Sequence, residues 1–436
     1  MRSWFSDGLL WRVFKNAALL MTGRAASGLF GLITLGLMAR GLGPETFGVV
    51  VLVQTYAFVV TGLTTFQSWQ ALIKFGADYI ERNDGPGFQA LVRFTTFLDA
   101  LGIAIGTTIA ILAIPFIGPL LGWNADVIAL AKPYCLIILF SMIATPTGLL
   151  RLFNRFDLLS MQSAMTPALR TIGCALAYAI DSGIAGYLVA WFVAGAVGGV
   201  VLMALGWREG VKSGRLAGLA WRKGFSQPRP GIWGFSLASN FNSSLVLIPN
   251  QMATFLVGLF AGPAAAGIYK IARDVSTALT KPAEMLNQSI YPEFAKLGSR
   301  DDWHVFARLI FRGGVFAGGA GLFFLMLTFA AGEPFIALAF GPEFSDAEPV
   351  LILLVCAATL AVTGFSMEPA LYAMGRPGLP LRVNAVAVLG IFLPALLIFG
   401  QQWGALGAGA AALAASTVNF LALAAFTVVQ LRKRPQ

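Results

Sequence analysis

The chain reads GIAGYLVAWFVAGAVGGVVLMALG from residue 183 to residue 206, a stretch of 24 residues without a charged side chain. About 20 consecutive apolar residues are enough for an α-helix to cross the hydrocarbon core of a membrane. Eleven other stretches are also long and mostly apolar, and this pattern predicts an all-α membrane protein. The twelve predicted spans are 16–38, 46–69, 91–117, 127–150, 161–180, 183–206, 232–260, 264–289, 309–331, 349–373, 379–400 and 404–430.

The composition of all 436 residues supports the same class, because 57% of them are hydrophobic and only 11% are charged. A soluble domain carries about 25% charged residues, so a soluble globular protein is excluded. The three cysteines lie inside apolar stretches without a CxxC pair, and His304 is the only histidine. We therefore expect no disulfide framework, no metal site, no catalytic residue and no cofactor.

The basic residues are distributed unevenly between the predicted loops. With the N-terminus placed in the cytoplasm, 23 basic residues fall on the cytoplasmic side, whereas Arg40 alone lies in the outer loops. Cytoplasmic loops of membrane proteins collect lysine and arginine, so this distribution predicts a multi-pass protein with both termini in the cytoplasm. Most of the net charge of +10 then comes from basic residues that mark the cytoplasmic side of the membrane. We expect membrane lipids, and no nucleic acid, among the partners.

Two short turns occur twice at nearly the same separation. Gly43-Pro44-x-x-x-Gly48 returns as Gly262-Pro263-x-x-x-Gly267, and Gly183-x-x-Gly186 returns as Gly404-x-x-Gly407. Gly-Pro turns also recur wherever helices end, but here each pair occupies equivalent points of two six-span halves. Such halves have the same membrane orientation and are related by a pseudo-two-fold axis along the membrane normal. The predicted domains are an N-terminal six-helix bundle (1–206), a basic cytoplasmic linker (207–231) and a C-terminal six-helix bundle (232–436).

Four basic residues, Arg24, Arg170, Lys270 and Arg273, lie deep inside the predicted spans. A charged side chain at the centre of a membrane helix costs roughly 2.5–3.5 kcal/mol, and such residues usually mark a substrate or ion path. The alternative is that they form internal salt bridges that only hold the helices together. Lys270 is placed to form such a bridge with Asp274 at i+4.

Acidic and amide side chains are also found within the spans. Asp99 and Asp274 are candidates for coupling to Na⁺ or H⁺, or else they are counter-ions of nearby basic residues. Asn240 and Asn242 stand in span seven, where lipid offers no hydrogen-bond partner. We expect these two residues to face a polar cavity.

Several motifs carry a resemblance to a known family. They are Lys15-Asn16, Ala39-Arg40-Gly41-Leu42-Gly43-Pro44-Glu45-Thr46-Phe47-Gly48, Gly375-Arg376-Pro377, Asn384 and Gly404-Ala405-Leu406-Gly407-Ala408. With these motifs the chain resembles, over nearly its whole length, the lipid-linked oligosaccharide flippases. These form the polysaccharide-transporter branch of the multidrug/oligosaccharidyl-lipid/polysaccharide exporter superfamily.

The resemblance implies a protein of the bacterial inner membrane that moves an undecaprenyl-diphosphate-linked oligosaccharide from the inner to the outer leaflet. It implies alternating access through a central cavity lined with cationic residues, to which Arg24 and Arg170 would contribute from one bundle and Lys270 and Arg273 from the other. Guanidinium groups suit this task because they bind phosphate oxygens bidentately. Other polysaccharide assembly proteins would be partners.

Three other functions are compatible with parts of the sequence. A cation-coupled multidrug antiporter of the same superfamily would share the fold, but it needs intramembrane carboxylates, and the excess charge at mid-depth is basic. An enzyme such as a glycan polymerase needs a large outward loop, and this chain has no such loop between its predicted spans. We therefore expect no enzyme. The sequence is also compatible with a scaffold protein or with an inactive relative of the transporters.

Overall fold

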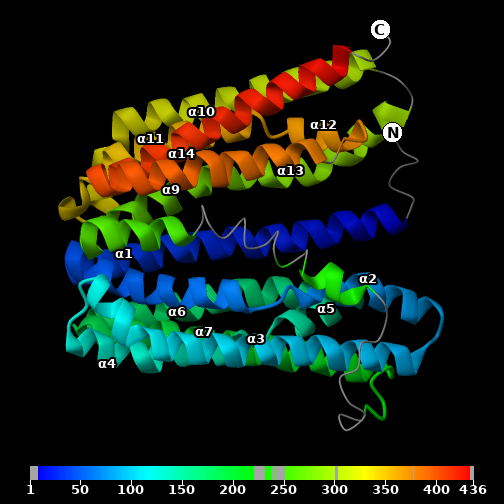
Figure 1. Cartoon of the computed structure of the whole chain (residues 1–436), viewed down its shortest axis with the longest axis horizontal. Helices are drawn as coiled ribbons and strands as arrows, with labels where there is room; N and C mark the ends of the chain where they lie inside the picture. The colour runs from blue at the N-terminus through cyan, green and yellow to red at the C-terminus, as the bar shows by residue number, and fades with distance from the viewer. Residues whose placement is uncertain are drawn as a thin grey trace. The chain divides into compact units, whose positions relative to one another are not determined.

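The computed structural model describes residues 8–219, 231–237, 240, 251–299, 303–376 and 378–432. Within these ranges every regular element is a helix, which confirms the predicted all-α fold class. The chain divides into two compact units (Figure 1): unit 1 is Met1–Gly41 with Val53–Leu247, and unit 2 is Leu42–Leu52 with Ile248–Gln436. The domain boundaries predicted at residues 206 and 231 stay predictions.

The helices of unit 1 follow one another along the first half of the chain, and α1 also passes through residues of unit 2. They are α1 (Gly8–Thr64), α2 (Ser68–Glu81), α3 (Gly85–Leu120), α4 (Ala125–Tyr134), the 3₁₀-helix η1 (Cys135–Ser141), α5 (Ala144–Leu152), α6 (Phe156–Ala179) and α7 (Gly183–Lys212).

Unit 2 is built from the second half of the chain. Its elements are α9 (Ala253–Ser299), α10 (Trp303–Phe340), the 3₁₀-helix η4 (Pro342–Phe344), α11 (Ala347–Thr363), α12 (Met367–Ala373), α13 (Gly378–Ala385), the π-helix η5 (Val386–Phe392) and α14 (Leu393–Arg432).

Three of the long helices are bent at glycines; two of the bends fall between predicted spans, and the third falls at the first residue of the last span. Gly43 in α1 has φ 69°, Gly262 in α9 has φ 84° and Gly404 in α14 has φ 56°. Glycine adopts positive φ without the steric cost that a Cβ atom brings. Eight stretches of the described chain are long and apolar enough to cross a membrane. The stretch Ala25–Glu81 contains the bend at Gly43, most of the first predicted span and all of the second.

The duplicated Gly-Pro turns meet one another within unit 2. A Cβ atom on Gly48 would collide with the backbone of Pro263, and a Cβ atom on Gly267 would collide with Phe47. Phe47 is fully buried and packs edge-on against Phe344, with ring centroids 5.5 Å apart. The repeat found in the sequence is therefore also a packing motif, because the glycines of both turns permit the close approach.

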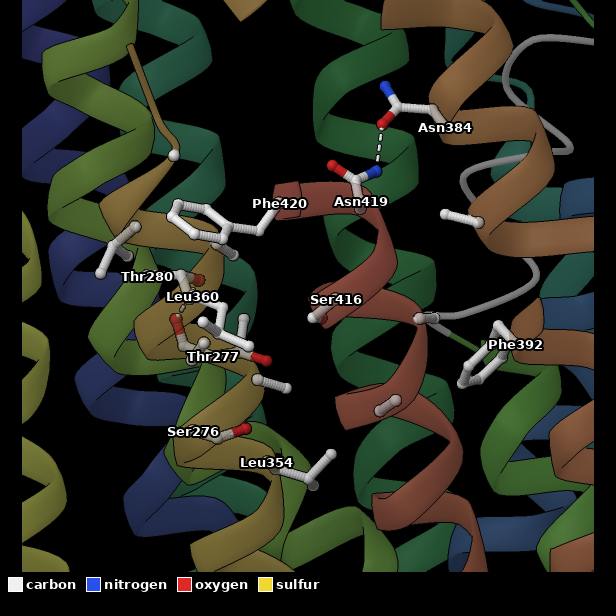
Figure 2. Close-up of a pocket in the computed structure, with 18 of the residues that line it drawn as sticks. Ser276, Thr277, Thr280, Leu354, Leu360, Asn384, Phe392, Ser416, Asn419 and Phe420 are labelled. Atoms are coloured by element: carbon white, nitrogen blue, oxygen red, sulfur yellow. Dashed lines mark hydrogen bonds between the residues drawn. The ribbon is translucent and has the colours of Figure 1, made fainter. Parts of the chain in front are cut away.

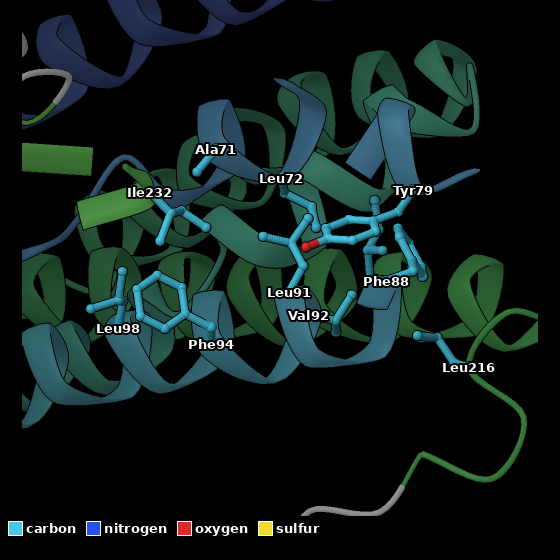
Figure 3. Close-up of a cluster of buried hydrophobic side chains, with 11 residues drawn as sticks. Ala71, Leu72, Tyr79, Phe88, Leu91, Val92, Phe94, Leu98, Leu216 and Ile232 are labelled. Carbon is cyan, nitrogen blue, oxygen red and sulfur yellow. The ribbon is translucent and has the colours of Figure 1, made fainter. Parts of the chain in front are cut away.

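A residue inside the predicted linker and the first residue after it pack into one apolar cluster of unit 1 (Figure 3). Leu216 and Ile232 lie in this cluster beside residues of α2 and α3 such as Leu72 and Phe94. Phe235 follows Ile232 by three residues, and the Nζ atom of Lys74 lies 4.2 Å from the centroid of its ring. The start of predicted span seven is thus held against α2 and α3.

Candidate substrate-binding site

Arg170 of α6 is a half-buried cation that contacts an aromatic ring. Its guanidinium carbon lies 3.6 Å from the centroid of the Trp191 ring in α7, and the Trp191 Nε1 atom donates a hydrogen bond to the Met38 sulfur at 3.1 Å. Within the described part of unit 1, no carboxylate pairs with Arg170, and its buried Nε atom has no hydrogen-bond partner. The ring face offsets part of the cost of burying the charge and leaves the N–H groups able to bind an anion.

Asp99 of α3 is bonded to two helix starts. The Ser68 hydroxyl donates to one carboxylate oxygen, and the backbone N–H of Thr145 donates to the other at 2.7 Å. Ser68 begins α2 and Thr145 is the second residue of α5, where backbone N–H groups are free and the helix dipole favours a negative charge. Asp99 is 3% exposed. Among the described residues it is therefore not a counter-ion of an arginine or lysine, and its coupling role stays a prediction.

The charged residues of α9 form a small cluster in unit 2. Lys270 contacts Asp274 at 2.7 Å, which is the ion pair expected from their spacing, and Arg273 contacts the other oxygen of Asp274 at 3.2 Å. Arg273 also donates to the Thr254 hydroxyl at 3.3 Å. One carboxylate shared by two cations leaves a formal charge of +1 on this cluster.

Arg273 also lines a cavity of about 480 Å³ that lies wholly within unit 2. The walls come from α9, α11, α12, α13, η5 and α14. Across the cavity from α9, the Asn419 amide donates to the Asn384 carbonyl oxygen at 2.6 Å (Figure 2). The polar or charged lining residues are Tyr269, Arg273, Ser276, Thr277, Thr280, Glu368, Asn384, Ser416 and Asn419, and the others are apolar or glycine.

The wall of this cavity includes the π-helix η5, directly after Asn384. Pro394 follows it and has no N–H to donate to the carbonyl of Gly390, so the regular α-helical pattern is interrupted there. Single π-helical turns often occur at functional sites. Asn384 lies beside Asn419, although the two residues stand 35 positions apart.

The structure brings only part of the predicted site together. Arg273 lines the cavity, Lys270 does not, and Asn240 belongs to unit 1. The side chain of Arg24 and the whole of Asn242 lie outside the described residues. Sequence reasoning did not assign a binding role to Asn384, Asn419, Ser416 or Glu368. The spacing of Ser416 and Asn419, one helical turn apart in an otherwise apolar span, is the signal that could have found them.

Comparisons with known proteins identify relatives that match large parts of the chain. A family model described as polysaccharide biosynthesis protein matches residues 13–298. The inner membrane protein YghQ of Escherichia coli is 34% identical over 351 residues, which cover 80% of this chain and 98% of YghQ. The lipopolysaccharide biosynthesis protein WzxC of Escherichia coli is 27% identical over 197 residues, which cover 41% of this chain and 38% of WzxC.

Solved structures show the same fold at low sequence identity. An inward-facing multidrug resistance MATE family transporter of the MOP superfamily aligns with a TM-score of 0.71 and 15% identity, covering 93% of this chain and 96% of that one. The lipid II flippase MurJ in an inward closed conformation aligns with a TM-score of 0.70 and 14% identity, covering 95% of this chain and 89% of that one. The TM-scores of the two structures are nearly equal, so the comparisons establish the fold and do not distinguish between their substrates.

Proposed function

We propose that this chain, which belongs to the polysaccharide biosynthesis protein family, moves an undecaprenyl-diphosphate-linked oligosaccharide from the inner to the outer leaflet of the bacterial inner membrane. The observation that carries the proposal is the guanidinium of Arg170, which is stacked on Trp191 and pairs with no carboxylate in the described part of unit 1. A cation kept in this state suits an anionic ligand, because a partner carboxylate would already have neutralised it.

The chemistry of the substrate matches this requirement. A diphosphate cannot enter hydrocarbon without partners for its charge, and arginine binds phosphate oxygens through a planar fork of N–H groups. The prenyl tail can stay in the bilayer while the headgroup passes. An inside-negative potential favours outward movement of the anion by about 2.3 kcal/mol per charge per 100 mV.

The remaining elements of the mechanism follow from the sequence. Arg24 would assist Arg170 in binding the diphosphate, whereas Lys270, Arg273 and the amides of span seven would bind the rest of the headgroup. Alternating access through a cationic central cavity stays a prediction, as do cytoplasmic termini, the absence of enzymatic activity and assembly with other polysaccharide proteins. Asp99 and Asp274 are the proposed sites for Na⁺ or H⁺ coupling.

The competing proposal, export of cationic drugs, needs a carboxylate that is open to the drug. Asp274 already contacts two cations and Asp99 accepts hydrogen bonds from Ser68 and Thr145. These two carboxylates therefore favour an anionic substrate, whereas Glu368, which lines the cavity of unit 2 and accepts a hydrogen bond from the Tyr372 hydroxyl, is the carboxylate that an antiporter would use.

Binding of soluble probes distinguishes the two proposals. Farnesyl diphosphate should bind the purified protein saturably and change the fluorescence of its tryptophans, since Trp191 lies against Arg170. Farnesol, which has the same chain without the charge, is the matched control and should bind at least about tenfold more weakly. Tetraphenylphosphonium should not compete. Saturable binding of tetraphenylphosphonium without binding of farnesyl diphosphate would establish the antiporter instead.

A further inference from the structure

We infer that the cavity of unit 2 is a sugar subsite, which holds a neutral glycosyl unit of the lipid-linked glycan and not its diphosphate. This inference rests on the proposed function and adds a division of roles between phosphate-binding and sugar-binding groups, each placed within its own unit. Arg170 in unit 1 is suited to the phosphates, whereas the cavity of unit 2 is suited to hydroxyl groups.

The charges of the cavity disfavour a diphosphate. Its lining contains one cation, Arg273, and one carboxylate, Glu368, so the formal charge of the lining is zero. The guanidinium of Arg273 is already bonded to Asp274 and Thr254. A ligand with two negative charges would have to break these bonds or remain unneutralised in a partly apolar site, which costs several kcal/mol. A neutral ligand meets no such cost.

The polar groups of the cavity match a ligand that both donates and accepts hydrogen bonds. The bond between Asn419 and Asn384 uses one N–H and one carbonyl oxygen, and each amide keeps further donor or acceptor capacity. On the facing wall, Thr277 donates to the Arg273 carbonyl oxygen and Thr280 donates to the Thr277 carbonyl oxygen. Their hydroxyl protons are used, so both oxygens are left as acceptors.

The placement of these groups fits a ligand bound between two walls. Figure 2 shows Thr277 and Thr280 on one side of the cavity and Ser416 and Asn419 on the other, with the Phe420 ring pointing away from the amide pair toward the side of Thr280. Sugars carry hydroxyl groups on their edges and apolar C–H groups on their faces. A volume of about 480 Å³ lies within the range of about 300–1,000 Å³ of small-molecule pockets, which are typically apolar with a few orienting polar groups.

Affinity measurements with matched lipids test this division. The probes are farnesyl diphosphate and three derivatives in which its terminal phosphate carries glucose, galactose or N-acetylglucosamine. Wild-type protein is expected to bind one derivative at least about tenfold more tightly than farnesyl diphosphate, the scale of a site built to bind hydroxyl groups. The preference should fall to about twofold or less in Asn384→Leu/Asn419→Leu, whereas the affinity for farnesyl diphosphate should stay unchanged.

The two asparagines are replaced together because each is the hydrogen-bond partner of the other. Removing both leaves no orphaned amide, which protects the fold. A second pair of variants keeps the test informative if that protein is unstable. Thr277→Val and Thr359→Val each remove a hydroxyl that donates to the carbonyl four residues earlier, but only Thr277 lines the cavity. The preference should fall a few-fold in Thr277→Val and stay unchanged in Thr359→Val.

The outcomes separate this inference from the proposed function. If farnesyl diphosphate binds but no glycosylated probe binds more tightly, or if the cavity variants keep the wild-type preference, the sugar subsite is wrong and the flippase proposal stands. If the leucine variant binds all four lipids more tightly, the cavity takes a prenyl chain instead, which also overturns the inference. If wild-type protein binds none of the lipids, the proposed function fails and the sugar subsite fails with it.

Discussion

Replacing Arg170 with alanine is expected to weaken the binding of farnesyl diphosphate by roughly 10- to 100-fold, because a hydrogen bond to a charged group contributes about 1.5–3 kcal/mol. The fold should tolerate the change. Arg170 pairs with no carboxylate in the described part of unit 1, so its removal leaves no unpaired negative charge. The measurement is a fluorescence titration together with a thermal unfolding curve of the same sample.

Two further arginine variants give this prediction its controls. Arg170→Lys keeps the charge but loses the planar fork and much of the stacking on Trp191, so its affinity should be intermediate. Arg155 lies at the start of α6 and contacts both Asp157 and Glu209. Arg155→Ala removes the same charge from an arginine that is already paired, and the affinity should stay unchanged. Equal affinities of wild type and a well-folded Arg170→Ala protein would remove the basis of the proposed function.

Replacing Asp99 with leucine is expected to destabilise unit 1 by about 2–5 kcal/mol, since each buried polar group left without a partner costs about 1–3 kcal/mol. The two groups are the Ser68 hydroxyl and the Thr145 N–H, at the starts of α2 and α5. Both helices would lose the acceptor that satisfies their first turn. The unfolding temperature in detergent should therefore fall clearly.

Asp84 supplies the matched control, because its carboxylate also accepts from the first turn of a helix, the Gly87 N–H of α3, but at an exposed position. Asp84→Leu should cost only about 1 kcal/mol, the usual effect of losing an N-cap. Asp99→Asn keeps an acceptor and should be milder than Asp99→Leu. If this variant is stable but its transport no longer responds to a pH or Na⁺ gradient, Asp99 also has a coupling role. An Asp99→Leu protein as stable as wild type would contradict the structural role.

The sequence was sufficient to predict the helical membrane fold and the position of its turns. Glycine next to proline predicted the ends of the first and seventh spans, and Gly43 and Gly262 bend α1 and α9 there. The breaks within spans two and four were not predicted. Residues 65–67 and 142–143 separate helices inside these spans. The mean hydropathy of the sequence hardly changes at these positions, although the backbone geometry does. The sequence signal for these breaks was Asp99, because a charged side chain in an apolar region requires hydrogen-bond donors near it.

The site was harder to predict than the fold. A helix that is apolar on nearly all faces has no polar stripe to indicate which side faces its neighbours, so the depth of Arg170 could be estimated but not its partner. The pairing of Arg170 with Trp191 and of Asn384 with Asn419 joins residues of different helices. Such contacts depend on helix packing, which one sequence does not determine. The pair Lys270–Asp274 was predictable because it lies within one helix.

Transport of a lipid-linked sugar between leaflets tests the central claim most directly. Liposomes containing a fluorescent undecaprenyl-diphosphate sugar are exposed to a membrane-impermeant quencher, and the inner-leaflet pool is followed over time. With wild-type protein that pool should become accessible to the quencher. With Arg170→Ala/Arg273→Ala it should stay protected, as in protein-free liposomes. An inner pool that stays protected with wild-type protein, or that becomes accessible at the wild-type rate with the double variant, would contradict a cationic path for the diphosphate.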